Sequence, residues 1–124
     1  MDRYEGIMYN KRKIGSKQEA IATKYLESLG YSIIENNFYC RSGEIDIIAK
    51  EGDYYVFIEV KYRSSTEHGY PIEAIDQRKI RKVVNTTKYY MLTHNISEYS
   101  PCRFDVIVIL GEDITLIKNA FDGY

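Results

Sequence analysis

The sequence predicts an α/β domain in which a mixed β-sheet is flanked by helices. Two segments carry apolar residues at the spacing of an amphipathic helix, and five others show the alternation or the dense Val and Ile content of strands. Along the chain these segments run helix, three strands, helix, two strands. The expected helices are residues 16–29 and 76–92, and the expected strands are residues 31–39, 44–50, 55–62, 103–110 and 114–118.

Length and composition limit the class of protein. A chain of 124 residues with 44% hydrophobic and 28% charged residues is typical of one globular domain with a single core. No apolar run approaches membrane-spanning length and the first residues lack the apolar core of a signal peptide, so we expect a cytoplasmic protein without a membrane partner. Cys40 and Cys102 lack metal-ligand spacing and are expected to be reduced thiols. The net charge of -1 argues against a protein that coats nucleic acid by bulk charge.

Residues 1–15 are polar and basic without a clear period, so we expect a flexible arm followed by a single domain at residues 16–124. The arm could contact phosphate, or it could be a solvated tail. Ser16 can cap the first helix and Gly30 can end it. Glu19 is in line with the core face of this helix, and Ser16-x-x-Glu19 also matches a capping box. The expected core face comprises Ala22, Tyr25, Leu26 and Leu29.

The first expected strand, which should be interrupted near Asn36 and Asn37, leads into a hairpin. The hairpin turn is the Gly-bearing stretch 51–54, and the strand period of two fixes the register. If Lys50 faces Tyr55, one face of the hairpin becomes wholly apolar, whereas a slip by one residue spoils both faces. The apolar pairs are Ile45–Val60, Ile47–Ile58 and Ala49–Val56.

The same register gathers charged residues on the other face of the hairpin. Asp46 falls opposite Glu59, and Glu44 falls opposite Lys61. Directly opposed side chains lie about 5 Å apart at Cβ, where two carboxylates repel unless a proton or a cation lies between them. A divalent metal is one solution, and ligands that are all oxygen suit Mg²⁺ or Mn²⁺. A salt-bridged surface patch, in which Lys61 neutralises one acid, is the alternative.

Beyond the hairpin, residues 63–69 form a polar loop in which Arg63 could bind phosphate or merely connect two elements. Asp76 is the expected N-cap of the second helix. Gln77 and Lys79 are in line with apolar positions of this helix, and Gln77 is expected to face the sheet. The other basic residues of the helix form either a surface for nucleic acid or a solvated face. The expected apolar stripe comprises Ile80, Val83, Val84, Thr87 and Met91.

The last two strands complete the predicted sheet. Residues 103–110 are dense in Val and Ile, which predicts burial on both faces. Asp105 alternates away from these apolar residues and could hold Arg103 or a lysine.

Several stretches resemble a known family. Asp46 followed by Glu59-Val60-Lys61 resembles the PD-(D/E)XK nuclease signature, and GEIDIIA followed by FIEVKYR resembles the YraN family of uncharacterised bacterial proteins, relatives of Holliday junction resolvases. The resemblance covers most of the chain and implies the αβββαβ core of the restriction-endonuclease-like fold. Its further landmarks are Glu19–Leu26, Gly30-Tyr31, Asn37, Gly69-Tyr70-Pro71 and Arg103-Phe104-Asp105.

The resemblance implies a Mg²⁺- or Mn²⁺-dependent endonuclease that hydrolyses phosphodiester bonds in DNA, structured or branched DNA included. Asp46 and Glu59 would bind the metal, with the Val60 carbonyl as an extra ligand and Glu19 approaching from the first helix. Lys61 would orient the attacking water or offset charge on the phosphate. The rival hypothesis is a nucleic-acid-binding or scaffolding module that keeps the nuclease fold without turnover. A homodimer that acts on symmetric DNA junctions is a third hypothesis.

The second helix carries the remaining family features. Lys79 matches a lysine of the family, whereas Ile80 stands where many relatives have a glutamine, so a polar residue that could assist the metal site is missing there. Contacts from this region would be to phosphate and therefore sensitive to salt. The residues expected to contact nucleic acid are Arg63, Gln77, Arg78, Lys79 and Arg81.

Overall fold

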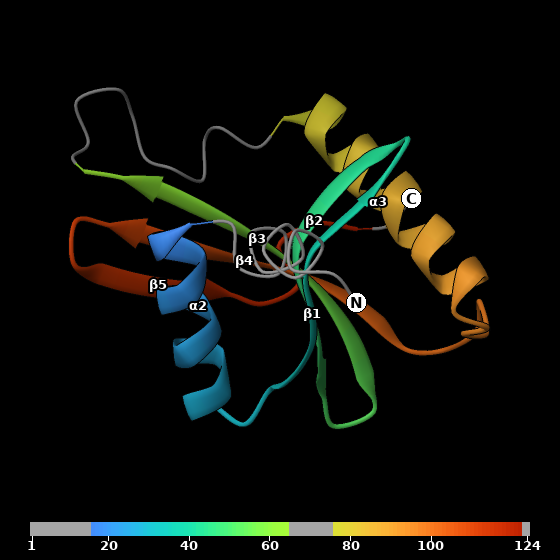
Figure 1. The fold of residues 1–124 in the computed structure, drawn as a ribbon, viewed down its shortest axis with the longest axis horizontal. Helices are drawn as coiled ribbons and strands as arrows, with labels where there is room; N and C mark the ends of the chain where they lie inside the picture. Colours follow the sequence, from blue (N-terminus) through green and yellow to red (C-terminus); the bar gives the residue numbers. More distant parts are fainter. Residues whose placement is uncertain (1–15, 65–75, 123–124) are drawn as a thin grey trace, which may run out of the picture.

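The computed structural model describes residues 16–64 and 76–122 (Figure 1). The expectations for an arm at residues 1–15 and for the loop beyond Ser64 concern residues outside these ranges. Within them, no helix combines the length and the apolar composition that crossing a membrane requires.

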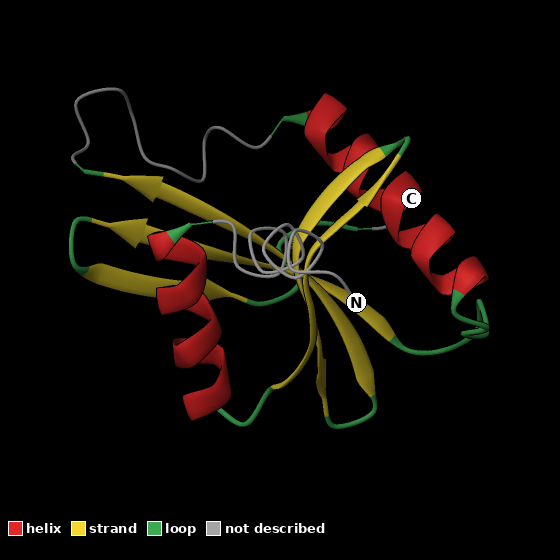
Figure 2. Cartoon of the chain, viewed as in Figure 1, coloured by secondary structure: helices red, strands yellow, loops and turns green. Residues whose placement is uncertain are grey.

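Two helices and five strands form the described part of the chain, in the predicted order. They are α2 (Lys17–Ser28), β1 (Ser32–Cys40), β2 (Gly43–Glu51), β3 (Tyr54–Arg63), α3 (Gln77–Thr93), β4 (Cys102–Leu110) and β5 (Asp113–Ile117). The strands lie side by side in chain order in one sheet; β3 and β4 are parallel, and the other neighbours are antiparallel. This mixed sheet with its two helices confirms the predicted fold class, and α2 to β4 follow the αβββαβ order of a restriction-endonuclease-like core (Figure 2).

Both helices begin at the caps that the sequence predicts. The Ser16 hydroxyl accepts a hydrogen bond from the Glu19 N–H at 3.1 Å, and an Asp76 carboxylate oxygen accepts one from the Lys79 N–H at 2.9 Å. Gly30 ends α2 at φ 95°, a conformation that favours glycine. The expectation that Leu29 belongs to the core face was wrong: Leu29 is the C-cap residue and is 47% exposed, because the helix ends before its side chain reaches the sheet.

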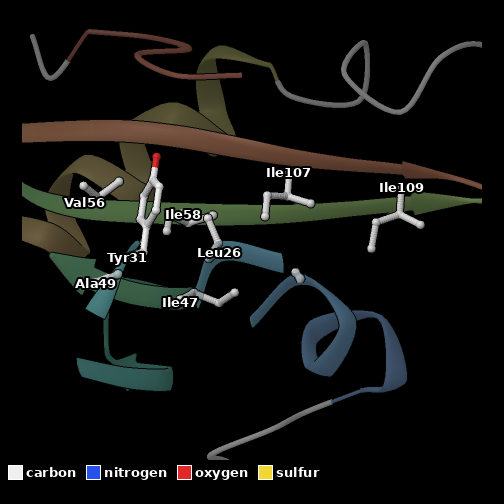
Figure 3. Close-up of a cluster of buried hydrophobic side chains, with 9 residues drawn as sticks. Leu26, Tyr31, Ile47, Ala49, Val56, Ile58, Ile107 and Ile109 are labelled. Carbon is white, nitrogen blue, oxygen red and sulfur yellow. The ribbon is translucent and has the colours of Figure 1, made fainter. Parts of the chain in front are cut away.

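Each helix packs on its own cluster of buried side chains. Ala22 and Leu26 of α2 contact a cluster from β2, β3 and β4 (Figure 3). α3 packs against a second cluster through Val83, Val84 and Met91, as its stripe predicts, and also through Tyr90. The sheet residues of the α2 cluster are Ile47, Ala49, Val56, Ile58, Ile107 and Ile109, and those of the α3 cluster are Phe38, Ile45, Ile48, Phe57 and Phe104.

The hairpin register is confirmed over most of its length. The ladder between β2 and β3 pairs Lys50 with Tyr55, as predicted. Followed away from the turn, the ladder ends at the pair Ile47–Ile58. Beyond that pair β3 continues beside β4, with Glu59 opposite Val106. The expected pairs Ile45–Val60, Asp46–Glu59 and Glu44–Lys61 are therefore not ladder pairs, because β2 parts from β3 at this point.

The expectation that Ile45 shares a face with Ile47 was also wrong. Ile47 lies in the α2 cluster and Ile45 in the α3 cluster, although they are two residues apart. The cause lies in β1, which stays one strand by its pairing but has Asn37 in the left-handed region at φ 53°. The flanking pairs are Asn36–Ile47 and Phe38–Ile45, so both strands change faces across the step that holds Asn37 and Asp46.

A network of charged groups joins β4 to Glu51 at the end of β2. The buried Asp105 carboxylate accepts hydrogen bonds from the Arg103 Nε at 2.8 Å, from the Tyr31 hydroxyl at 2.8 Å and from the Asn119 N–H at 3.0 Å. Arg103 Nη2 also donates to Glu51 Oε1 at 2.7 Å. The expectation that Asp105 could hold Arg103 is confirmed, and the network links β2 and β4 to the residues that flank β1 and β5.

Asp105→Asn should destabilise the protein by about 3 kcal/mol, because it removes one partner of a buried ion pair and leaves Glu51 as the remaining acidic partner of Arg103 among the described residues. Urea denaturation measures this change in the free energy of unfolding. Asp113→Asn, at the exposed start of β5, is the matched control and should have little effect. Equal stabilities of the two variants would contradict a structural role for Asp105.

Candidate metal centre

The two acids of the nuclease-like signature meet where β2 parts from β3. The Val60 N–H donates a hydrogen bond to Asp46 Oδ2 at 2.8 Å, so a side chain binds this amide at a position where the β2 ladder has ended. The carboxyl of Asp46, on β2, is therefore held in a fixed orientation against β3, the strand that carries Glu59. The two carboxyl groups are close enough to interact directly. Burial has the larger effect on the pKa of Glu59, and the interaction with Asp46 raises that pKa further.

Glu59 is a buried acid with incomplete hydrogen bonding. The residue is 2% exposed. Among the described residues, Glu59 Oε1 has no hydrogen-bond partner, while Glu59 Oε2 lies 3.4 Å from Lys79 Nζ. A buried carboxylate oxygen without a donor is costly, so this position favours either a proton or a cation.

The pKa values of both acids lie above their ordinary range. Burial, followed by the charge of Asp46, raises the pKa of Glu59 to about 8. Burial also raises the pKa of Asp46, while the Val60 N–H and the Lys79 charge act in the opposite direction. At neutral pH the pair therefore holds a proton, which a divalent cation would displace.

The two lysines of the site differ from the sequence-based expectation. The alternative of a salt-bridged patch had Lys61 neutralising one acid, but within the described ranges no acidic group lies at ion-pair distance from it, and it affects Glu59 only as a nearby charge. Lys79 forms the ion pair instead. Sequence reasoning assigned Lys79 to nucleic acid, and its only signal for this contact was its alignment with the buried Val83 along α3.

The Glu19 side chain is bound to β1. Its Oε2 accepts a hydrogen bond from Asn37 Nδ2 at 2.6 Å, which fixes the first turn of α2 to the step where β1 changes faces. The described segments contain no group of three or more His, Cys, Asp or Glu side chains placed to hold a metal. The sequence did not predict that Asn37 would bind Glu19. The signal was two adjacent asparagines within the pattern of a strand.

The other predicted residues of the interface lie around the start of α3 and the end of β3. Arg78 and Arg81 are exposed, and so is Gln77, contrary to the expectation that it faces the sheet. Gln77 is the first residue of α3, where the chain has not yet reached the sheet surface. Arg63 Nη1 donates to the carbonyl of Tyr62 at 2.8 Å. Ile80 packs against the α3 cluster.

The start of β2 and α3 approach each other closely beside this site. Gly43 has φ 144°, and a Cβ atom there would lie 3.4 Å from Thr86 Oγ1 and 3.8 Å from Lys82 Cβ. The φ of Gly43 favours glycine, and the short distances to Thr86 and Lys82 show that α3 lies directly over the end of β2 that carries Asp46. This packing brings Lys79 to the acid pair.

Glu59→Gln should change the pH dependence of stability in EDTA. The folded-state pKa of Glu59 is raised above 4.5, so the stability that the proton gives is full below that pH and is lost as pH rises through about 8. The amide cannot ionise, so from about pH 5 to about pH 9 the variant should gain roughly 2–4 kcal/mol in unfolding free energy relative to the wild type. Urea denaturation across this range measures it. The exposed control Glu98→Gln should follow the wild type, and parallel curves for Glu59→Gln would show that Glu59 does not carry the bound proton.

Comparison with known proteins assigns the chain to a family. The model of the uncharacterised protein family UPF0102 matches residues 18–109. A UPF0102 protein of Lachnoclostridium phytofermentans is 53% identical over 115 residues, which is 93% of this chain and 98% of the relative. Relatives from Persephonella marina and Legionella pneumophila are 45% and 43% identical over 87% and 88% of this chain and over 92% and 94% of their own lengths. The chain therefore belongs to the uncharacterised family UPF0102, in agreement with its resemblance to the YraN proteins.

Proposed function

We propose that the protein is a metal-dependent nuclease that hydrolyses phosphodiester bonds in DNA. The observation that carries the proposal is the buried carboxyl of Glu59, whose Oε1 has no hydrogen-bond partner among the described residues and which lies beside Asp46. Two adjacent carboxyl groups that are partly desolvated and incompletely neutralised form a set of oxygen ligands for a hard divalent cation. The resemblance of Asp46 and Glu59-Val60-Lys61 to the PD-(D/E)XK signature supports the same reaction class.

The residues present fit Mg²⁺ or Mn²⁺. Asp46 and Glu59 would hold the ion, with the Val60 main-chain carbonyl as a further ligand. When bound, the ion would supply a water of lowered pKa and polarise the phosphate. The hydrogen bond from the Val60 N–H keeps Asp46 oriented before any ion binds, so little ordering of that ligand is needed.

The surrounding residues have separate roles in the proposed reaction. Lys61 follows Glu59 by two positions on β3, so its charge is available to orient the attacking water or to offset negative charge on the phosphate. Arg78 and Arg81 are exposed on the first turns of α3, where they would contact the phosphates of bound DNA.

One observation favours a second function, a nucleic-acid-binding or scaffolding module without turnover. Glu19, expected as a third acid, is held by Asn37, and no three-acid group is present in residues 16–64 and 76–122. Two acids with a main-chain carbonyl would leave more of the ion's coordination to water and substrate phosphate, as Mg²⁺ sites commonly do. The nuclease remains the better-supported proposal because a module that only binds DNA has no need for a buried acid pair.

Asp46→Asn should reduce metal-dependent cleavage by at least about 100-fold, because it removes a charged ligand while its amide oxygen can still accept the Val60 N–H. The assay incubates purified protein with single-stranded, duplex, flap and four-way-junction DNA in Mg²⁺, Mn²⁺ or EDTA. Asp53→Asn, in the exposed turn between β2 and β3, is the control and should cleave like the wild type. Loss of product in EDTA and in Asp46→Asn supports the nuclease. A wild type that binds these DNAs without cleaving any of them would instead support the binding module.

The double variant Arg78→Ala/Arg81→Ala should weaken the salt dependence of DNA binding. Each lost phosphate contact should change the log–log slope by roughly 0.9 on duplex DNA, so the pair should flatten it by up to about 1.8. The measurement is a fluorescence anisotropy titration at several salt concentrations. Lys17→Ala/Lys24→Ala removes the same charge from α2, which packs on the other cluster, and should leave the slope near its wild-type value. An unchanged slope for the α3 variant would show that Arg78 and Arg81 form only a solvated face.

A further inference from the structure

Lys79 is the cation that the fold brings to the acid pair. Its Nζ lies 3.4 Å from Glu59 Oε2, and 30% of the Lys79 side chain is exposed against 3% of that of Glu59. The Lys79 charge also acts on Asp46 and lowers its pKa, against the larger effect of burial. The ammonium group therefore interacts with both acids and also retains contact with solvent.

The backbone of Lys79 is anchored while its side chain can move. Its N–H is bound by the capping carboxylate of Asp76 at 2.9 Å, and the packing of α3 over Gly43 fixes the helix beside β2. The lysine side chain has four rotatable bonds and a compact charge, so the ammonium can shift by several ångströms without any movement of the helix. An ammonium at 3.4 Å from one oxygen of Glu59 leaves the other oxygen free for a second cation.

We propose that Lys79 partly neutralises the acid pair in the metal-free protein and that a divalent cation releases it to bind the DNA phosphate next to the cleaved bond. The inference rests on the proposed nuclease function and deepens it. In this inference Lys79, on α3, links the binding of a metal ion to the binding of the DNA substrate.

A count of charges supports this exchange. The ionised pair of Asp46 and Glu59 carries two negative charges, and Lys79 offsets one of them. With a divalent cation in place, the acids are neutralised and the Lys79 charge is in excess. A phosphodiester group carries one negative charge, so it is the anion that restores neutrality, and Lys79 is exposed enough to reach it.

The inference separates the roles of the two lysines near the site. Lys61 lies on the same strand as Glu59 but forms no ion pair with an acid of the described residues. Lys61 is therefore not displaced when a cation binds. Of the two lysines, Lys79 alone has a contact that a metal ion would replace, so Lys79 and not Lys61 should compete with the metal.

The test measures Mg²⁺ affinity without DNA, by calorimetry at the same pH for every variant. Lys79→Met should bind Mg²⁺ roughly three- to ten-fold more tightly than the wild type, because no resident ammonium remains near the pair. Lys79→Arg keeps the charge and should stay close to the wild type. Lys61→Met is the matched control and should change the affinity less than Lys79→Met. Thermal melting in EDTA checks that each variant is folded.

A second measurement follows DNA binding with Ca²⁺ in place of Mg²⁺ and, separately, with EDTA. Lys79→Met should weaken binding several-fold in Ca²⁺ and leave it nearly unchanged in EDTA, because Lys79 reaches the phosphate only after a cation has released it. Equal losses in both conditions would show an ordinary phosphate contact and overturn the exchange.

The outcomes distinguish the inference from the proposed function. If the wild type binds Mg²⁺ and Lys79→Met binds it equally or more weakly, the exchange is wrong and the metal site stands. If the wild type binds no divalent cation, the proposed metal-dependent function fails and the exchange fails with it. If Lys61→Met and Lys79→Met tighten Mg²⁺ binding equally, the effect is one of general charge, and the specific role of Lys79 is overturned.

Discussion

The hydrogen bond from the Val60 N–H to Asp46 Oδ2 is the contact on which the site depends. Beyond the Ile47–Ile58 pair, β3 continues beside β4 without β2, and only side-chain contacts can keep the start of β2 close to it. The same step contains the left-handed Asn37 in β1. Where β2 and β3 separate, the Asp46 carboxylate thus takes the place of a ladder hydrogen bond to Val60. The same bond holds this carboxylate next to that of the buried Glu59.

The elements and most of the register could be predicted because they depend on local patterns. Alternation in the hairpin fixes Ile47 opposite Ile58, since a one-residue slip would set a charged side chain opposite an apolar one and spoil both faces. Ile45 was misplaced because strand alternation holds only while the backbone stays extended, and the interruption lies in another strand, at Asn37. The paired asparagines suggested an irregularity in β1, but nothing in the pattern of β2 shows that it changes faces with its neighbour.

The candidate site was predictable to the same extent. Asp46 and Glu59 lie on adjoining strands of one hairpin, so register arithmetic places them together. The contact of Lys79 with Glu59 was not predictable, because it joins elements separated by a long connection, and helical periodicity gives only the direction of a side chain. Glu19 illustrates the same limit: its face on α2 was identified, but its partner depends on how the left-handed Asn37 directs its amide.

Two buried acids on the neighbouring strands β3 and β4 have their burial compensated in opposite ways. Asp105 is fully buried and receives hydrogen bonds from Arg103, Tyr31 and the Asn119 N–H, so the fold compensates its burial completely. Glu59 is almost equally buried but has one lysine at 3.4 Å and an oxygen without a partner among the described residues. Since the sequence can supply a full set of donors for one acid, the incomplete set around Glu59 is better explained by a cation that completes it than by a structural role.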